Sequence, residues 1–350
     1  MALDTENSLV LLVPGIMGSR LRYHGPDDAG RLTDETLWGA DGVQNLDILR
    51  RHPERLRAPC VYADQVIRSM DFGGLEETDL YGNMIRFCLS PVGLGLTEGT
   101  TFHPFAYDWR RDNIFSANQL AERIRNLDPT NNKRVYLIAH SMGGLVSRIM
   151  LNNASDISAR TRLLFQISSP LEGSPKAFFT LNKHPEFSTL LDRYYLSGSW
   201  FSAKRHAQLL TTVQSVSSLF QLLPPRHVNV LIGPDNTEYP AVHPEAWPLQ
   251  FHGQLDRANA AQPLLDVPPS IPIRGVYAEG HATDSQFVVN RDWTIIRRLR
   301  RNHGDATVLA SSALARTIAE NHIAITNGST DHVALCGNPD VHALLKEAIQ

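Results

Sequence analysis

The chain has 350 residues, of which 42% are hydrophobic and 20% are charged, which is the composition of an ordinary globular protein. Its formal net charge of −3 excludes a strong general attraction to nucleic acid or to an anionic membrane. The three cysteines form no Cys-x-x-Cys pair and cannot all be paired within one chain, which favours reduced thiols in a cytoplasmic protein over a disulfide framework.

The first residues of the chain support the same expectation. They are acidic and lead directly into an apolar segment, without the basic and apolar regions of a signal peptide. No apolar run approaches the roughly 18–20 residues that a transmembrane helix needs. We therefore expect a cytoplasmic protein that makes at most peripheral contact with a membrane.

Apolar runs and helical periodicity predict the main elements in chain order. An uninterrupted apolar run at residues 9–13 ends at Pro14-Gly15 and predicts a strand that is buried on both faces. Further strands are predicted at 135–139, 162–167, 273–277 and 323–326, and helices at 118–127, 144–151 and 341–349. Buried strands alternating with amphipathic helices are typical of an α/β protein with a mostly parallel sheet.

Two long stretches interrupt this alternation. Residues 31–99 are rich in turn-forming residues, and residues 174–269 are rich in aromatic residues, histidine and proline. Stretches of this length in a compact α/β domain are usually lids or inserted subdomains. We predict a cap at 174–269, inserted into a core formed by 1–173 and 270–350. For the irregular, lid-like stretch at 31–99, a purely structural role is equally consistent.

Ser141 lies between a predicted strand and a predicted helix. In segment 139–143, Ala-His-Ser-Met-Gly, small residues flank the serine, as a tight strand–turn–helix elbow requires because the two backbones nearly touch. A helix N-cap serine is the alternative, but it does not explain the small residues on both sides. The pattern predicts an α/β-hydrolase fold, a mostly parallel sheet flanked by helices with an inserted cap or lid subdomain, in which Ser141 is the nucleophile.

A serine nucleophile also needs donors for the oxyanion that forms during acyl transfer. Segment 13–19, Val-Pro-Gly-Ile-Met-Gly-Ser, follows the first strand, and its two glycines allow the backbone to turn inward. We assign the Ile16 amide, together with the amide of Met142, which follows the serine. Alone, Pro-Gly after a strand is only a turn, and its pairing with the elbow is what favours this assignment.

The acid and the base should follow the serine, each in a loop after a late strand. The candidate acids late in the chain are Asp284, Asp292 and Asp305, and the residues alone leave the choice among them open. For the base, His332 stands in a polar turn between the last strand and the last helix, where a loop-borne base belongs. The other histidines considered as the base are His303, beside a candidate acid, His322, at the start of the strand, and His342, in the helix.

Four segments resemble, in order, those of the lecithin–cholesterol acyltransferase-like family of α/β-hydrolases, which includes lysosomal phospholipase A2 and phospholipid–diacylglycerol acyltransferases. They are segment 13–19, Tyr-Asp-Trp-Arg at 107–110, Ala-His-Ser-Met-Gly-Gly at 139–144 and Gly-Asp-Ala-Thr-Val at 304–308. The second is the most distinctive, since hydrolases in general lack it. The resemblance implies Ser141 as nucleophile, Asp305 as acid and His332 as base, and it supports Ile16 and Met142 as oxyanion donors.

Other conspicuous residues have structural and functional interpretations. Asp108, Trp109 and Arg110 either brace the fold or line an acyl pocket, and we favour the brace. The arginine-rich run 297–301 is interpreted as a charged face with its leucine buried. Leu37-Trp38 is interpreted as buried rather than as a mobile lid. We expect no metal and no cofactor, because the sequence has neither clustered metal ligands nor a phosphate-binding glycine loop.

Together these features predict a serine hydrolase that cleaves carboxylic, lipid-type esters through a Ser-His-Asp triad and an acyl-enzyme. Two alternatives remain: an acyltransferase that passes the acyl group to an alcohol, and a non-catalytic binding protein on a hydrolase fold. The expected partner is an acyl-ester substrate, such as a phospholipid or another lipid, and no nucleic acid is expected. Acyl-chain and head-group specificity, oligomeric state and protein partners are left open.

Overall fold

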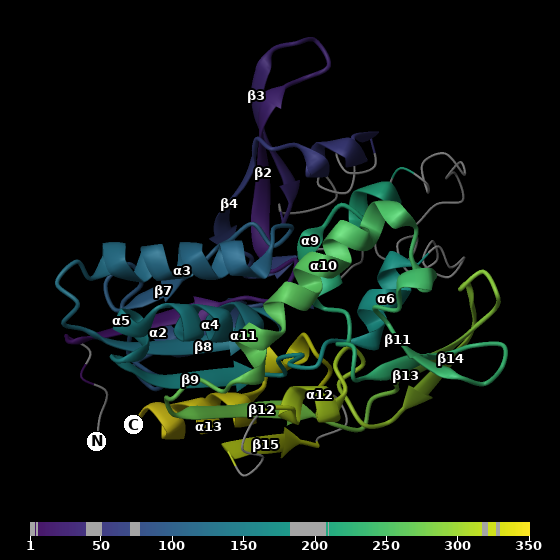
Figure 1. The fold of residues 1–350 in the computed structure, drawn as a ribbon. Helices are drawn as coiled ribbons and strands as arrows, with labels where there is room; N and C mark the ends of the chain where they lie inside the picture. The colour runs from purple at the N-terminus through teal and green to yellow at the C-terminus, as the bar shows by residue number, and fades with distance from the viewer. Residues whose placement is uncertain are drawn as a thin grey trace.

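The computed structural model describes residues 4, 6–39, 51–70, 78–182, 208, 210–316, 321–326 and 330–350. At the centre of this part of the chain is a six-stranded sheet in which all neighbouring strands run parallel. In spatial order its strands are β15 (His322–Ile325), β12 (Ile273–Ala278), β9 (Thr161–Ile167), β8 (Arg134–His140), β1 (Ser8–Val13) and β7 (Phe102–Pro104). Helices flank the sheet (Figure 1), and the fold is that of an α/β-hydrolase, as predicted.

Strand β1 shows why the central strands are mostly apolar. Its six residues are all buried, and successive side chains of a strand point to opposite faces of a sheet. Leu9 and Leu11 pack into the core beneath one pair of helices, and Val10 and Leu12 pack into the core beneath another pair. The first pair is α3 (Asn113–Leu127) and α4 (Met142–Asn153), and the second is α2 (Gly82–Leu89) and α13 (Pro339–Ile349). Because both faces are covered, the strand favours apolar side chains, and its one polar residue, Ser8, is also buried.

Each predicted strand and helix overlaps an observed element, and the ends differ by a few residues. The largest difference is at α3, which begins at Asn113 rather than at 118. The Asp112 side chain accepts hydrogen bonds from the amides of Ile114 and Phe115. An aspartate N-cap of this kind satisfies amides that the first helical turn leaves without acceptors, so the helix extends beyond its apolar periodic segment.

The described part of 31–99 is more regular than predicted. Its strands β3 (Leu32–Trp38) and β4 (Val61–Val66) pair with β2 (Ser19–Pro26), which precedes the stretch, and the three form an antiparallel sheet that projects from the core (Figure 1). Also in this stretch are η1 (Pro53–Arg57), β5 (Ser69–Met70), β6 (Thr78–Asp79) and helix α2. Leu37 and Trp38 are buried, as interpreted. Residues 40–50 and 71–77 lie outside the described residues, and a lid-like role remains a prediction.

A second sheet crosses the predicted boundary at residue 269. Its strands, in spatial order, are β11 (Glu238–Pro240), β10 (Asn229–Ile232), β13 (Thr283–Val289) and β14 (Ile295–Arg301). The last two come from a range that the sequence assigned to the core, so the structure differs there. The helices within 174–269 are α6 (Pro175–Leu181), α9 (Ser217–Gln221), η2 (Pro244–Ala246), η3 (Leu249–Phe251), α10 (His252–Ala261) and α11 (Pro263–Asp266). Part of the predicted cap, 183–207 and 209, lies outside the described residues.

The arginine-rich run forms β14. Arg297, Arg300 and Arg301 are exposed, as expected of a charged face. Arg298 differs, because it pairs with Asp284 and its guanidinium lies 4.0 Å from the centre of the Phe179 ring. The leucine of the run, Leu299, is only half-buried. The sequence did not predict this strand, because β-strands are usually recognised by apolar alternation and the arginines interrupt it.

Three further short helices lie within the described residues: α5 (Ser155–Ser158), α12 (Ala310–Leu314) and η5 (Ala334–Gly337). The last two follow the turns that carry Asp305 and His332. Within the described ranges, no helix combines the length and the apolar character that crossing a bilayer requires.

Candidate active site

Ser141 occupies a sharp turn between β8 and α4. Its φ of 54° and ψ of −128° lie in a region that residues with side chains rarely adopt. The turn brings backbones into contact: a Cβ on Gly143 would lie 2.2 Å from the Val13 carbonyl oxygen. A Cβ on Gly15 would lie 2.8 Å from that of Ser141. These approaches are the physical reason for the small residues that the sequence pattern identified.

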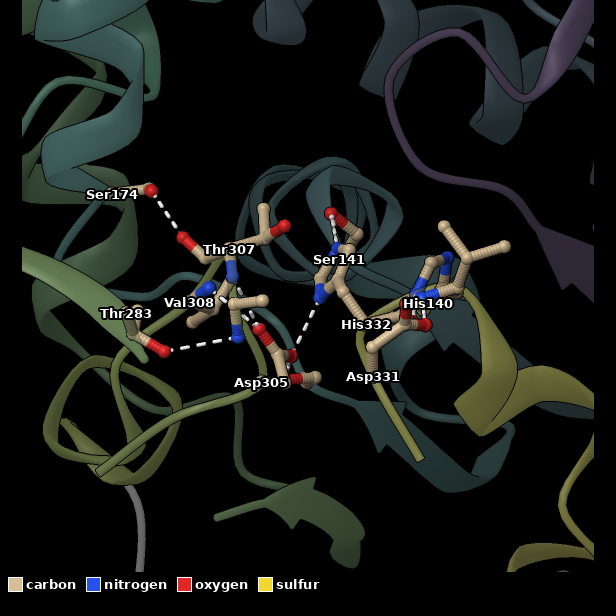
Figure 2. Close-up of polar contacts among 12 residues, drawn as sticks. His140, Ser141, Ser174, Thr283, Asp305, Thr307, Val308, Asp331 and His332 are labelled. Atoms are coloured by element: carbon tan, nitrogen blue, oxygen red, sulfur yellow. Dashed lines mark hydrogen bonds and ion pairs between the residues drawn. The ribbon is translucent and has the colours of Figure 1, made fainter. Parts of the chain in front are cut away.

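A line of hydrogen bonds joins the three residues predicted as nucleophile, base and acid (Figure 2). His332 Nε2 lies 2.9 Å from Ser141 Oγ. His332 Nδ1 lies 2.6 Å from Asp305 Oδ2. All three side chains are buried, and Asp305 has no exposed surface. The structure therefore brings together residues that are 191 and 27 positions apart.

Asp305 is held as an anion by its donors. Its Oδ1 accepts hydrogen bonds from the amides of Val308 at 2.7 Å and Thr307 at 3.0 Å, and its Oδ2 accepts one from the Ser168 hydroxyl. Burial by itself raises the pKa of Asp305, but the charge and hydrogen bond of His332, followed by Ser168 and Val308, outweigh it and lower the pKa to about 2. An ionised Asp305 accepts a hydrogen bond from His332 Nδ1–H and fixes the orientation of the ring.

The other candidate acids have different surroundings. Asp284 is buried in the second sheet, where its carboxylate pairs with Arg298 at 2.7 Å and Arg300 at 3.1 Å. Asp292 is exposed in the turn after β13. Of the three candidates, Asp305 is the one whose carboxylate contacts His332, and it has the geometry of the predicted acid.

The other candidate bases are also placed away from the serine hydroxyl. His342 lies on α13, where its Nε2 is 2.8 Å from the Cys336 carbonyl oxygen and its ring stacks on Phe87. His303 is exposed, and His322 begins β15. The loop position that distinguished His332 in the sequence is the one that faces Ser141.

The predicted oxyanion segment is a tight turn held by side chains from other elements. The Gly15 amide donates to the Tyr81 hydroxyl at 2.7 Å, and the Gly18 amide donates to the Gly15 carbonyl at 3.1 Å. Trp38 Nε1 donates to the carbonyl of Met17, whose φ is 64°. The turn is thus fixed in a strained shape directly against Ser141, which gives it the rigidity that an oxyanion hole needs.

The two predicted oxyanion amides belong to the residues that follow Gly15 and Ser141, which lie against each other. Ile16 follows Gly15, which touches Ser141, and Met142 opens helix α4. Within the described part of the chain, neither amide donates to a protein acceptor. Amides in the first turn of a helix lack intrahelical acceptors and favour negative charge. Both groups are therefore available to donate to a substrate oxygen, and their role remains a prediction.

Segment 107–110 has the contacts of a structural brace. The Tyr107 hydroxyl donates to the Pro14 carbonyl at 2.8 Å, and Trp109 Nε1 donates to the Ser19 carbonyl at 3.1 Å. The Arg110 guanidinium donates two hydrogen bonds to the Asp108 carboxylate, at 2.6 and 2.7 Å. Its guanidinium also donates to the carbonyls of residues 56, 58 and 61. The segment thus connects the projecting sheet with the turn at residues 14–18, which we call the oxyanion turn.

Three further residues around the site were not identified from the sequence: Tyr81, His140 and Ser168. His140 precedes Ser141 in the elbow, so its place in the motif was an available signal. Ser168 directly follows β9 with a φ of 45°, next to the strand that leads to the serine. Tyr81 follows a short strand, and no pattern in the sequence links it to residue 140. Across the described ranges, no three His, Cys, Asp or Glu side chains gather to hold a metal ion.

The chain is similar in sequence to one family model and to one plant protein, each over about half of its length. A model of the family described as lecithin:cholesterol acyltransferase matches residues 52–224. Lecithin-cholesterol acyltransferase-like 4 of Arabidopsis thaliana is 26% identical over 194 residues. That match covers 49% of this chain and 36% of the relative, so the chain spans well under two thirds of the relative's length.

One solved structure is similar to the chain over nearly its whole length. A chain in the crystal structure of the Tle4–Tli4 complex has a TM-score of 0.59 and 15% identity, and the match covers 98% of each chain. A lipase of Bacillus licheniformis has a TM-score of 0.40 and 12% identity, covering 99% of this chain and 94% of the lipase. At these identities, the first match shows a shared fold and leaves activity open.

Proposed function

We propose that the protein is a serine hydrolase that cleaves carboxylic esters through Ser141, His332 and Asp305. The observation that carries the proposal is the line of hydrogen bonds from Ser141 Oγ to His332 Nε2 and from His332 Nδ1 to Asp305 Oδ2, at 2.9 and 2.6 Å. The strained elbow supports it, because such strain is common at active sites and has no structural need in an ordinary strand–helix connection.

The chemistry proceeds in two steps. His332 removes the Ser141 proton as the hydroxyl oxygen attacks the ester carbonyl, and Asp305 stabilises the imidazolium that forms. The amides of Ile16 and Met142 donate to the oxyanion of the tetrahedral intermediate. The intermediate expels the alcohol, which takes the proton from His332, and leaves the acyl group on Ser141. Water, deprotonated by His332, then attacks the acyl-enzyme and releases the acid.

Lipid-type esters are the proposed substrates. The family match over residues 52–224 supports this class, and so does the similarity to the Arabidopsis protein. The finer assignment, to the branch of lysosomal phospholipase A2 and the phospholipid–diacylglycerol acyltransferases, rests on the four motif segments and is part of the proposal. A panel of esters of increasing acyl length, with phospholipids and lactones included, tests it.

A fluorophosphonate probe tests the nucleophile. We expect covalent labelling of the wild type and none of Ser141→Ala, and no ester turnover by Ser141→Ala. His332→Ala should lose at least about 10³-fold in kcat, whereas the matched control His303→Ala, whose side chain is exposed, should keep full activity. Labelling that persists in Ser141→Ala would refute the assignment, and a wild type that is never labelled would favour a non-catalytic binding protein.

Acyl transfer to an alcohol is the second candidate. The similarity to a family described as acyltransferases favours it, and the same three side chains serve both reactions, since only the group that attacks the acyl-enzyme differs. Product analysis with and without a long-chain alcohol separates the two. Ester product that forms at the expense of free acid would favour the transferase.

A further inference from the structure

A buried tyrosine and a buried histidine connect the oxyanion turn with the loop of the base. The Tyr81 hydroxyl lies 2.7 Å from the Gly15 amide nitrogen and 2.7 Å from His140 Nδ1. His140 Nε2 lies 3.0 Å from the His332 carbonyl oxygen. Tyr81 and His140 are 3% and 5% exposed, so these groups have little access to water. The catalytic steps proposed above use neither side chain.

The chemistry of the partners fixes the direction of every hydrogen bond in this series. The His332 carbonyl can only accept, so His140 Nε2 must carry a proton and donate it. Burial, followed by the nearby charge of His332, lowers the pKa of His140 to about 3, so the ring is neutral and its Nδ1 bears no proton. The Tyr81 hydroxyl therefore donates to Nδ1, while its oxygen accepts from the Gly15 amide.

We propose that Tyr81 and His140 are positioning residues of the proposed hydrolase: Tyr81 holds the oxyanion turn, His140 holds the backbone of the base, and their hydrogen bond keeps the two in register with Ser141. The inference rests on the proposed function. Each end of the hydrogen-bonded series has its own consequence for the reaction, and the two consequences can be tested separately.

At the oxyanion turn, Tyr81 determines which amide is available. It occupies the Gly15 amide, and the carbonyl of Gly15 accepts from Gly18. The peptide groups on both sides of residue 15 are thereby held, and the next amide, that of Ile16, has no protein acceptor within the described residues. Without the Tyr81 hydroxyl, the Gly15 amide would be a buried donor lacking an acceptor, and the turn would rotate to satisfy it.

At the base, His140 acts on the backbone rather than on the ring nitrogens. The rings of His140 and His332 lie 4.7 Å apart, and the His332 amide donates to the Asp305 carbonyl at 3.0 Å. The backbone of residue 332 is thus fixed through its amide by the acid loop and through its carbonyl by His140. A neutral His140 also adds no positive charge beside the imidazolium that His332 becomes during the reaction.

Two substitutions of His140 separate its two hydrogen bonds. Glutamine can place an amide nitrogen near the position of Nε2 and keep the bond to the His332 carbonyl. Asparagine can place an oxygen near the position of Nδ1 and keep the bond to Tyr81, but it is too short to reach residue 332. His140→Gln therefore breaks the link to the turn, and His140→Asn breaks the link to the base.

The experiment compares wild type with Tyr81→Phe, His140→Gln and His140→Asn. It measures kcat and KM on a short-chain p-nitrophenyl ester, the rate of fluorophosphonate labelling, and Tm. Tyr81→Phe should lower kcat and the labelling rate by about 10- to 100-fold with KM within about threefold of wild type. His140→Gln should retain more activity than His140→Asn. Tyr23→Phe is the matched control, because it removes a tyrosine hydroxyl bonded to a carbonyl, that of Pro26, in the projecting sheet, and it should leave kcat unchanged.

The outcomes separate this inference from the function beneath it. If the wild type is active and Tyr81→Phe keeps kcat and labelling within about threefold, the positioning role is wrong and the proposed function stands. Activity of both His140→Gln and His140→Asn within about threefold of wild type would also overturn it. A wild type that neither turns over esters nor takes the label would overturn both proposals. If Tyr81→Phe does not fold, the two His140 variants still decide the question.

Discussion

Replacing Asp305 by asparagine tests the proposed acid with little change of shape. The amide oxygen of the introduced asparagine could still accept from Val308 and Thr307, as Oδ1 does now. Its nitrogen, however, would point a donor at His332 Nδ1, where the carboxylate now accepts. Nδ1 would then have to be the unprotonated nitrogen, and the proton would move to Nε2. A ring protonated at Nε2 cannot take the proton of Ser141.

The size of the effect follows from the charge that is lost. A carboxylate and an imidazolium in contact, with charge centres about 4 Å apart, attract by about 4 kcal/mol at an effective dielectric constant of about 20. That energy corresponds to about 10³-fold in rate, and the wrong tautomer adds to it, so we expect kcat to fall by about 10³- to 10⁴-fold. KM should change little, because Asp305 is fully buried behind His332.

The matched control is Asp284→Asn. This aspartate is also buried, and it also pairs with cations, Arg298 and Arg300, but in the second sheet. We expect its loss to lower Tm and to leave kcat near that of the wild type. The assay is the initial rate on a short-chain ester, with Tm measured in parallel. The reasoning would be refuted if Asp305→Asn kept more than about a tenth of the wild-type kcat. It would also be refuted if kcat of Asp284→Asn fell as far as that of Asp305→Asn.

The surroundings of Asp305 and Ser141 give three more expectations. Ser168→Ala removes one donor from Asp305 and should lower kcat by about tenfold, as initial rates would show; an unchanged rate would contradict it. The fold lowers the pKa of Asp305 from 3.8 to about 2. About 2 kcal/mol of the free energy of unfolding, present above pH 3.8, should therefore be lost as pH falls toward 2. Urea unfolding measured across this pH range should show the loss in the wild type and not in Asp305→Asn. Gly143→Ala, whose Cβ would lie 2.2 Å from a backbone oxygen, should lower Tm and abolish turnover, whereas Gly253→Ala, with open space, should do neither.

The central sheet could be predicted from the sequence because of how it is buried. Strands such as β1 and β8 are covered on both faces, so nearly every position is apolar and the run stands out. Strand β14 could not be found in this way. Its Arg298 owes its place to partners elsewhere in the chain, Asp284 and Phe179, and no pattern within the strand reveals them.

The same distinction applies to the site. Ser141 and the glycines around it could be predicted because the tight turn restricts residues that are neighbours in the sequence. The acid could not be chosen from the residues alone, since Asp284 and Asp305 both follow glycine-containing turns, and only the fold shows that one faces arginines and the other faces His332. Tyr81 was missed because its partners are 66 and 59 positions away.

The second sheet has a consequence for any attempt to exchange parts of this protein. Strand β10 pairs in parallel with β13, and β12 of the central sheet lies between them in the sequence. The second sheet is therefore built from two separate segments of the chain, with a strand of the central sheet between them, and cannot be exchanged as one continuous segment. A chimera that transplants residues 174–269 alone would replace β10. Strand β13 would then either pair with a foreign strand or be left with an unpaired edge. We expect such a chimera to fold only when residues 174–269 and the β13–β14 hairpin are moved together.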